Sequence, residues 1–165
     1  MIVKQFSSSD DIEEIKAVAE KAFSSTSDSR LDDWFSFTEM IKAIKEQTGA
    51  CIKIFLDNKI AGVVYAEQES PINGKEGKEK WVIVLTAVEP SQSGKGVGTK
   101  LLNAIEEVAI NYGALKMFVY TNKGDDQVVN FYKKNGYVDA GSIKDYQYGR
   151  NNSAVFLLKH LTNEF

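Results

Sequence analysis

The chain has 165 residues, of which 43% are hydrophobic and 26% are charged, and its formal net charge is −3. This balance is typical of a folded globular chain and excludes an intrinsically disordered one. A nucleic-acid partner is not expected, because no basic excess is present to neutralise phosphates. The length suits one domain with its own core, and we expect a single domain over residues 1–165.

Cysteine and histidine each occur once, as Cys51 and His160. These two residues are too few for a disulfide or a structural zinc site, so no metal is expected. Cys51 alternates with apolar neighbours and is interpreted as a core residue, and His160 as an exposed tail residue. The early charges and the lack of a run of about 20 apolar residues predict no signal peptide and no membrane association. A cytoplasmic location is the simplest expectation.

The first half of the chain predicts a strand, two helices and two further strands. Ile2–Phe6 is a short apolar strand, and Asp10 with Glu13 has the pattern of a capping box at the start of a helix. Asp32 or Asp33 is expected to begin the second helix. A polar loop is expected over residues 24–30, strands over 50–56 and 60–67, a hairpin turn at 57–59 and a polar loop over 68–80.

The next stretch joins a strand, a glycine-rich turn and a helix. Trp81–Val88 is almost wholly apolar, which predicts a strand covered on both faces. Glycine then occupies every second position of Ser93–Gly98, and apolar residues recur at helical spacing from Val97 up to an expected cap at Gly113. The rest of the chain predicts a strand over 115–121, a helix over 126–135 and strands over 137–142 and 154–158.

The glycine-rich turn predicts an anion site, best suited to a phosphate or pyrophosphate. Glycines let backbone N–H groups approach a bulky ligand, and the first turn of a helix adds unpaired N–H groups. A plain tight connection is the alternative. Neither common nucleotide motif fits: a Walker A loop needs Ser or Thr where Gly96 follows Lys95, and a dinucleotide fingerprint needs glycine where Thr99 stands.

The stretch resembles the coenzyme A loop of the GNAT superfamily of N-acetyltransferases. That family's pattern is Arg or Gln, two residues, Gly, one residue, then Gly or Ala. Gly96 and Gly98 match the glycines, and Ser93 stands at the Arg/Gln position. The predicted order β-α-α-β-β-β-α-β-α-β-β is also that of the GNAT fold, an α/β fold with a mixed sheet and helices on both faces.

A second segment is similar to another signature of the same family. There the family has Asn, then Ala three residues on, then Leu/Phe-Tyr-Glu-Lys-x-Gly-Phe. Asp125 and Val128 replace the Asn and the Ala, and the residues in register are Phe131, Tyr132, Lys134, Gly136 and Tyr137. The resemblance implies that Tyr132 lies near the thioester sulfur and acts as general acid, since a phenol with a pKa of about 10 can protonate a leaving thiolate. Packing beneath the sheet is its alternative role.

The resemblance implies acetyl-CoA as cosubstrate and direct acetyl transfer to a primary amine on a small molecule, peptide or protein. The strands on either side of the glycine turn are expected to part and admit the pantetheine arm. The residues expected to contact the coenzyme are Thr86, Ala87, Val88, Ser93, Gly94, Lys95, Gly96, Val97, Gly98, Thr99, Asp125, Phe131, Tyr132 and Lys134.

The general base is less defined than the acid. Many relatives carry a carboxylate on the strand before the glycine turn, where this chain has Val84-Leu85-Thr86-Ala87. The nearest candidates are Glu67 and Glu69, at the end of the preceding strand, and Glu67 follows Tyr65 at period two on one face of that strand. A solvated Glu67 with water relaying the proton is the alternative.

The residues expected at the pocket for the acceptor amine are aromatic. Trp34, Phe35 and Phe37 are expected to pack, with one of them lining the acceptor pocket, and Tyr146 and Tyr148 are expected to border it. Two other functions stay open: a non-catalytic acyl-CoA-binding module or sensor, and an acyltransferase that uses a longer acyl group or another nucleophile. Either a monomer or a homodimer is compatible with the sequence.

Overall fold

The structure is a computed structural model that describes residues 1–10, 12–24, 30–147 and 152–162. Tyr148 and most of the polar stretch over 24–30 lie outside the described residues. The elements are β1 (Ile2–Gln5), α1 (Glu13–Phe23), α2 (Phe37–Lys45), β2 (Gly49–Leu56), β3 (Lys59–Gln68), α3 (Gly74–Glu79), β4 (Lys80–Val88), α4 (Val97–Asn111), β5 (Lys116–Asn122), α5 (Asp126–Lys134), β6 (Val138–Ile143) and β7 (Ala154–His160).

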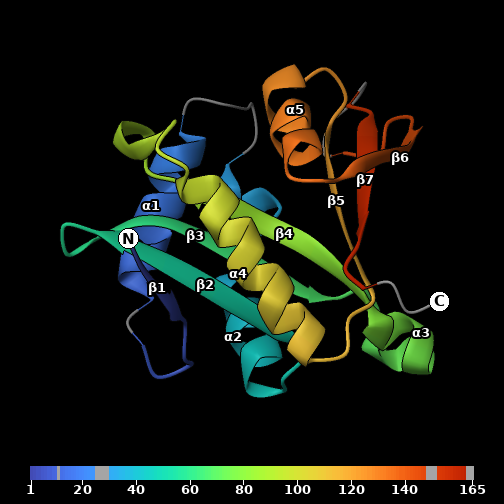
Figure 1. Cartoon of the computed structure of the whole chain (residues 1–165), viewed down its shortest axis with the longest axis horizontal. Coiled ribbons are helices and arrows are strands. Elements are labelled where there is room, and N and C mark those ends of the chain that lie inside the picture. Colours follow the sequence, from blue (N-terminus) through green and yellow to red (C-terminus); the bar gives the residue numbers. More distant parts are fainter. Residues whose placement is uncertain (11, 25–29, 148–151, 163–165) are drawn as a thin grey trace.

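The strands form one seven-stranded mixed sheet in the order β1-β2-β3-β4-β5-β7-β6. All neighbouring strands are antiparallel except β4 and β5, which are parallel and are joined through α4. Figure 1 shows α4 lying across one face of the sheet, with α1 and α2 behind it on the other face. The predicted fold class and element order are confirmed, with α3 added between β3 and β4.

The sheet separates two hydrophobic cores. The first, here called the α4 core, includes Leu101, Leu102 and Ile105 of α4 together with Tyr132 of α5. The second, the α1 core, is built from α1, α2 and the opposite face of the sheet, and its members include Ile15, Phe35, Met40, Cys51 and Tyr65. A sheet covered on both faces buries nearly continuous apolar strands, which explains the composition of β2, β3 and β4.

β4 contains one extra residue relative to the segment of β3 with which it pairs. Tyr65 pairs with Leu85 and Ala66 with Ile83, so Val84 has no opposite residue. A bulge of this kind changes the face on which the following side chains lie. Ile83 therefore belongs to the α4 core, whereas Val84 and Leu85 pack in the α1 core. The prediction that this strand is covered on both faces is confirmed.

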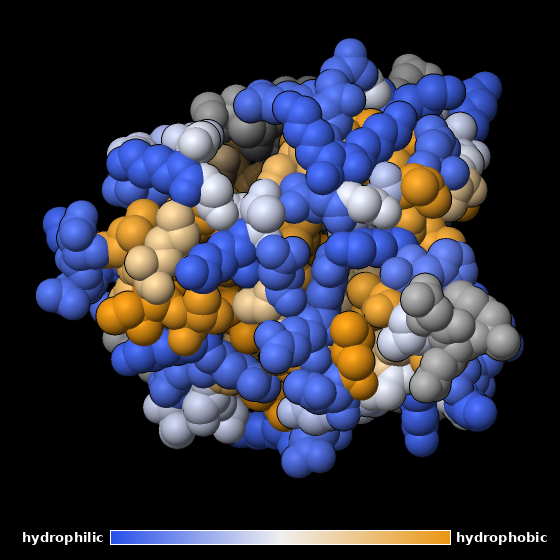
Figure 2. All heavy atoms as spheres, in the orientation of Figure 1, coloured by the Kyte–Doolittle hydropathy of each residue, from blue (hydrophilic) through white to orange (hydrophobic). Residues whose placement is uncertain are grey.

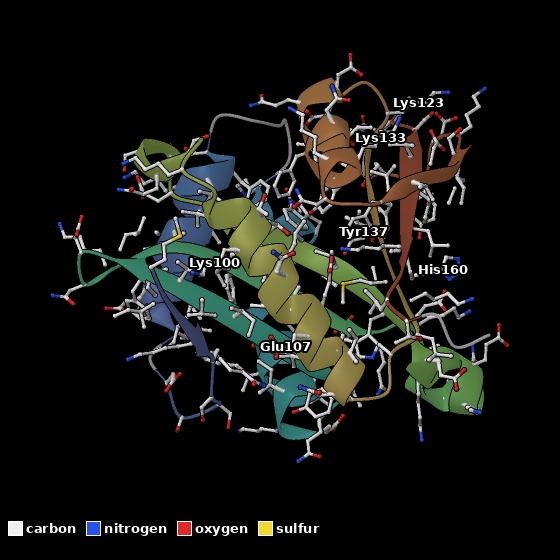
Figure 3. All side chains as sticks on the ribbon, viewed as in Figure 1. Lys100, Glu107, Lys123, Lys133, Tyr137 and His160 are labelled. Atoms are coloured by element: carbon white, nitrogen blue, oxygen red, sulfur yellow. The ribbon has the colours of Figure 1, made fainter. Side chains whose placement is uncertain are left out.

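A buried polar network ties α4 to the end of α5 and to β7. The Glu106 side chain of α4 accepts hydrogen bonds from the Tyr137 hydroxyl at 2.9 Å and from Lys159 Nζ at 2.7 Å. Glu106 is 8% exposed, although it lies on a helix whose other buried residues are apolar. Burial and the neighbouring carboxylate raise the pKa of Tyr137. Tyr137 lies between α4 and β7 in Figure 3.

Several local predictions are wrong. Asp10 does not cap α1: its carboxylate accepts from the Ser7 N–H and pairs with Lys53, and the helix begins at Glu13 without a side-chain cap. The second helix begins at Phe37 with Ser36 as its cap, because a 3-10 turn over Leu31–Asp33 precedes it. The predicted loop over 68–80 contains the short helix α3.

No helix within the described residues is long and apolar enough to cross a membrane. The exposed large apolar residues are mostly scattered, which is normal for a protein surface. Figure 2 shows apolar atoms gathered where the chain begins, and there Met1, Ile2 and Val3 of the edge strand are exposed.

We expect Lys159→Met to lower the free energy of unfolding by about 1.5–3 kcal/mol, because Glu106 loses its charged partner inside a low-dielectric site. Urea denaturation followed by circular dichroism measures the change. Lys78→Met, on the exposed side of α3, is the control and should leave the unfolding midpoint within error. Equal midpoints for both variants would show that the network contributes nothing to stability.

We expect the only thiol of the chain to be unreactive in the native state. Cys51 is fully buried, and burial raises its pKa to about 12, so almost no thiolate is present at neutral pH. Native protein treated with DTNB at pH 8 should release no thionitrobenzoate, whereas protein in denaturant should release one equivalent per chain. Fast labelling without denaturant would contradict the packing around Cys51.

Candidate active site

The glycine turn leads directly into α4. Gly94 and Gly96 have φ angles of 76° and 79°, a region that glycine adopts without strain. A Cβ placed on either would meet nothing within 4 Å, so the space beside the turn is open. Gly96 caps α4 without a side-chain bond, and the N–H groups of residues 97–99 have no partner inside the helix. Open donors at the positive end of a helix dipole fit a phosphate group.

Next to the turn, β4 and β5 part. Residues 80–82 pair with residues 116–118, and beyond that point β4 stays paired with β3 as far as Val88. From Ile83 to Val88, no strand lies against the other edge of β4 in the part of the chain that the structure describes. Figure 1 shows the two strands diverging, with α5 beside the opening. Backbone N–H and C=O groups on this edge are available to an extended ligand.

Tyr132 points at the open edge from α5. Its hydroxyl donates a hydrogen bond to Thr86 Oγ1 at 3.0 Å, and the residue is 4% exposed. The bulge at Val84 makes this contact possible, because it turns Thr86 toward the α4 core in which Tyr132 lies. Burial raises the pKa of Tyr132 to about 12, and the Thr86 hydrogen bond opposes that shift. The phenol is therefore protonated over the whole physiological pH range.

The start and the face of α5 fix where Tyr132 lies. Asp125 caps this helix by accepting from the Val128 N–H at 3.3 Å. Phe131 packs edge-on against Tyr132, and a Cβ on Gly98 would come within 2.9 Å of the Phe131 ring. The third glycine of the turn is therefore required by the contact between α4 and α5.

On the other face of the sheet, β3 carries a carboxylate near the opening. The Tyr65 hydroxyl donates a short hydrogen bond to Glu67 Oε2, as expected for two residues on one face of a strand. Burial and Glu67 raise the pKa of Tyr65, and burial, Tyr146 and Glu67 raise the pKa of Tyr120. Glu67 therefore lies among phenols that stay neutral. No protein partner takes its Oε1 among the described residues.

A family model described as "Acetyltransferase (GNAT) family" matches residues 10–137. The chain belongs to the acetyltransferase (GNAT) family. The match contains the glycine turn, the open edge of β4 and all of α5, which are the parts of the structure described above. Acetyl transfer is therefore the class of reaction of this protein.

Solved acetyltransferases share the fold at low sequence identity. A ribosomal-protein-alanine N-acetyltransferase from Brucella melitensis has a TM-score of 0.78 at 14% identity, covering 97% of this chain and 99% of its own. An aminoglycoside 6'-acetyltransferase type Ii has a TM-score of 0.77 at 17% identity and 99% coverage of both chains. An aminoglycoside 6'-N-acetyltransferase complexed with coenzyme A has a TM-score of 0.73 at 15% identity and 99% coverage of both chains. Their acceptors differ, so the shared fold leaves the acceptor undecided.

The acetyltransferase brings together most of the residues singled out from its sequence. Residues 93–99 line the turn, residues 86–88 lie on the open edge of β4, and Phe131 and Tyr132 face both. Three further side chains expected to contact the coenzyme have protein partners or lie exposed. Lys95 Nζ donates to Gln92 Oε1 at 3.0 Å, Asp125 serves as a helix cap, and Lys134 is exposed in the last turn of α5. Lys133 of α5, labelled in Figure 3, is likewise exposed.

Two features near the site were not predicted. The bulge at Val84 and the Thr86 partner of Tyr132 depend on pairing with β3, which leaves no local mark in the sequence.

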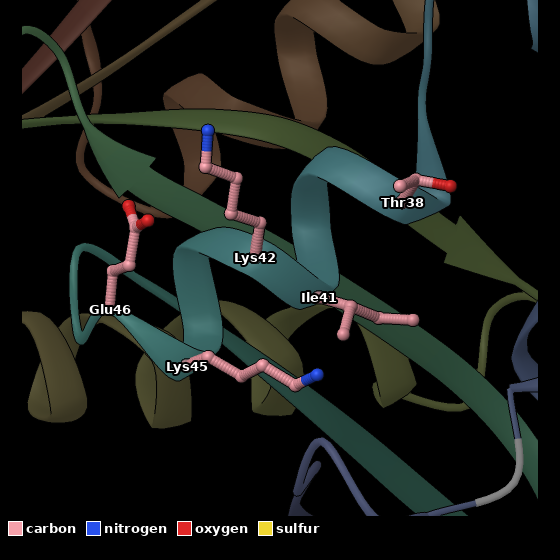
Figure 4. Close-up of a pocket in the computed structure, with 5 residues that line it drawn as sticks. All are labelled: Thr38, Ile41, Lys42, Lys45 and Glu46. Atoms are coloured by element: carbon pink, nitrogen blue, oxygen red, sulfur yellow. The ribbon is translucent and has the colours of Figure 1, made fainter.

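A hollow of about 350 Å³ lies along the outer surface of α2 (Figure 4), lined by Thr38, Ile41, Lys42, Lys45 and Glu46. It is formed by one helix and is separate from the opening of the strands. No group of side chains suited to a metal ion occurs in the described part of the acetyltransferase.

Proposed function

We propose that the protein transfers the acetyl group of acetyl-CoA directly to a primary amine, with Tyr132 as general acid and Glu67 as general base. The observation that carries this proposal is the Tyr132 hydroxyl, which is buried and hydrogen-bonded to Thr86 on the unpaired edge of β4. The phenol faces an unpaired strand edge, close to a glycine turn suited to a phosphate. This combination favours a catalytic role for Tyr132 over a role in packing alone.

The residues present fit coenzyme A. The glycine turn offers open N–H groups to the pyrophosphate, and the unpaired edge from Ile83 to Val88 offers peptide groups to the two amides of the pantetheine arm. Thr86, Ala87 and Val88 would contact the arm, and residues 93–99 the phosphates. Phe131 would border the arm from the α5 side. Lys95 and Lys134 are free to move toward the phosphates from the surface, where they now lie exposed.

Acetyl-CoA supplies an acyl group already activated as a thioester. The amine nitrogen must be neutral to attack, since an ammonium has no free electron pair and its pKa is about 10.4. A C–N bond forms, the C–S bond then breaks, and the sulfur leaves as a thiolate. The Tyr132 hydroxyl gives its proton to that sulfur and recovers one from water.

Glu67 would take the proton that the amine loses. One carboxylate oxygen is occupied by Tyr65, which fixes the orientation of the group, and the other is open. Glu67 lies on the face of the sheet opposite α5, so acid and base approach the opening from different sides. In this arrangement the acid would act on the departing sulfur and the base on the arriving nitrogen.

We expect Gly96→Ala to lower the affinity for coenzyme A by about tenfold or more, because a Cβ enters the open space at the turn and misaligns charge-assisted N–H donors. Calorimetric titration with coenzyme A measures the change. Gly113→Ala is the matched control: Gly113 also has a positive φ, of 89°, and open space around it, but it lies at the other end of α4. Both variants should lose similar stability, and only the first should lose affinity.

We expect Tyr132→Phe to lower kcat by about 100-fold or more and to change the coenzyme A affinity far less, since it removes the proton donated to the leaving thiolate. Thiol release with DTNB measures turnover, and the buried Cys51 adds no background. Tyr112→Phe is the control, because Tyr112 stacks on Trp81 at the far end of α4. Full turnover by Tyr132→Phe would remove it from the mechanism.

The function itself is tested by incubating the protein with acetyl-CoA and a panel of primary amines. Thiol release that depends on the amine, with an acetylated product of the expected mass, supports the transferase. Calorimetric binding of acetyl-CoA without thiol release for any amine would instead support the acyl-CoA-binding sensor.

A further inference from the structure

One part of the sheet carries aromatic side chains that no helix covers. On the face of α1 and α2, β5 presents Phe118 and Tyr120, and the paired residues of β7 are Leu158 and Phe156. In the described structure, α1 packs on β3 and β4 and α2 packs on β2, while α5 packs on β6 and β7 from the other face. Aromatic residues on β5 and β7 are therefore left open on the acceptor side of the strand opening.

A cluster of three aromatic rings, here called the aromatic platform, consists of Tyr120, Phe156 and Tyr146. The ring centroids lie 5.2 Å apart for Tyr120 and Tyr146, 5.3 Å for Tyr120 and Phe156, and 5.3 Å for Tyr146 and Phe156. Tyr120 is 37% exposed and Tyr146 is 49% exposed. Large rings that hold one another in place while staying open to solvent are typical of a binding surface.

The platform lies next to Glu67. Phe118 pairs with Val82, and Val82 pairs with Glu67, so the carboxylate and the first ring of β5 share one face across β4. Tyr120 is two residues further along β5, on the same face, beside the open edge. Burial, Tyr146 and Glu67 raise the pKa of Tyr120, in agreement with this placement. One anionic group and one set of rings thus face the point where the acceptor would react.

We infer that the acceptor is a primary amine attached to an aromatic or other flat apolar group, with its nitrogen at Glu67 and its ring on the aromatic platform. This inference rests on the proposed function and specifies its substrate. The platform offers three rings that pack edge-on or tilted against one another. A flat apolar group gains edge-to-face and stacking contacts there, whereas a second ammonium would have to exchange its hydration for cation–π contact.

The first experiment compares three amines with acetyl-CoA: phenethylamine, butylamine and the diamine putrescine. The kcat/KM for phenethylamine should exceed the kcat/KM for butylamine by about 3- to 10-fold, which is the range expected for aromatic contacts beyond area burial. Putrescine should be no better than butylamine. Equal values for phenethylamine and butylamine, or a preference for putrescine, would overturn the inference.

The second experiment uses Tyr146→Leu, which removes one ring from an exposed position and keeps an apolar side chain. The variant should lose most of the preference for phenethylamine over butylamine, and calorimetric titration with phenethylamine should show weaker binding. Tyr112→Leu, at a position that is 40% exposed at the C-terminal end of α4, is the matched control and should change neither amine. An unchanged preference in Tyr146→Leu would also overturn the inference.

The failures of the two proposals are distinguishable. Binding of acetyl-CoA without thiol release for any of the three amines would sink the transferase. Turnover of all three amines without an advantage for phenethylamine would leave the transferase intact and sink only the acceptor class.

Discussion

The site depends on an irregularity in β4. One unpaired residue, Val84, moves the strand's side chains from one face of the sheet to the other, and within the same stretch the strand loses its pairing with β5. Without the bulge, Thr86 would face the α1 core, and the Tyr132 hydroxyl would have no partner on the strand. Without the parting of the strands, the edge would be closed by hydrogen bonds to β5. The proposed binding of the acyl donor and the proposed proton donation by Tyr132 therefore depend on the same irregularity in β4.

The two faces of the sheet carry different groups of the proposed site. The α4 core carries the glycine turn, Phe131 and Tyr132, which are the groups proposed to bind and break the thioester. The opposite face carries Tyr65, Glu67 and the aromatic platform, which are proposed to receive the amine. Tyr132 and Tyr65 accordingly belong to separate cores on the two sides of the sheet.

The sequence predicted what depends on local pattern. The element order, the glycine turn, the pairing of Tyr65 with Glu67 on one face and the placement of Tyr132 on a short helix all follow from periodicity and turn residues. What it missed depends on contacts between distant segments. Glu106 would be assigned to solvent from its charge, and it is buried because Lys159, 53 residues later, pairs with it. The helix α3 has no apolar period, and its Gly77 fits under the Ser70 carbonyl, where a Cβ would clash.

The Glu106 network has a consequence for uniqueness of structure and not only for stability. An apolar contact between α4 and α5 tolerates sliding, because dispersion and burial have little directionality. A carboxylate with two fixed donors accepts one arrangement of α4, Tyr137 and Lys159. Tyr137 in turn packs edge-on against Tyr132 at 5.5 Å. The network thus fixes the position of α5 along the open strand, and hence the position of the Tyr132 hydroxyl along that edge.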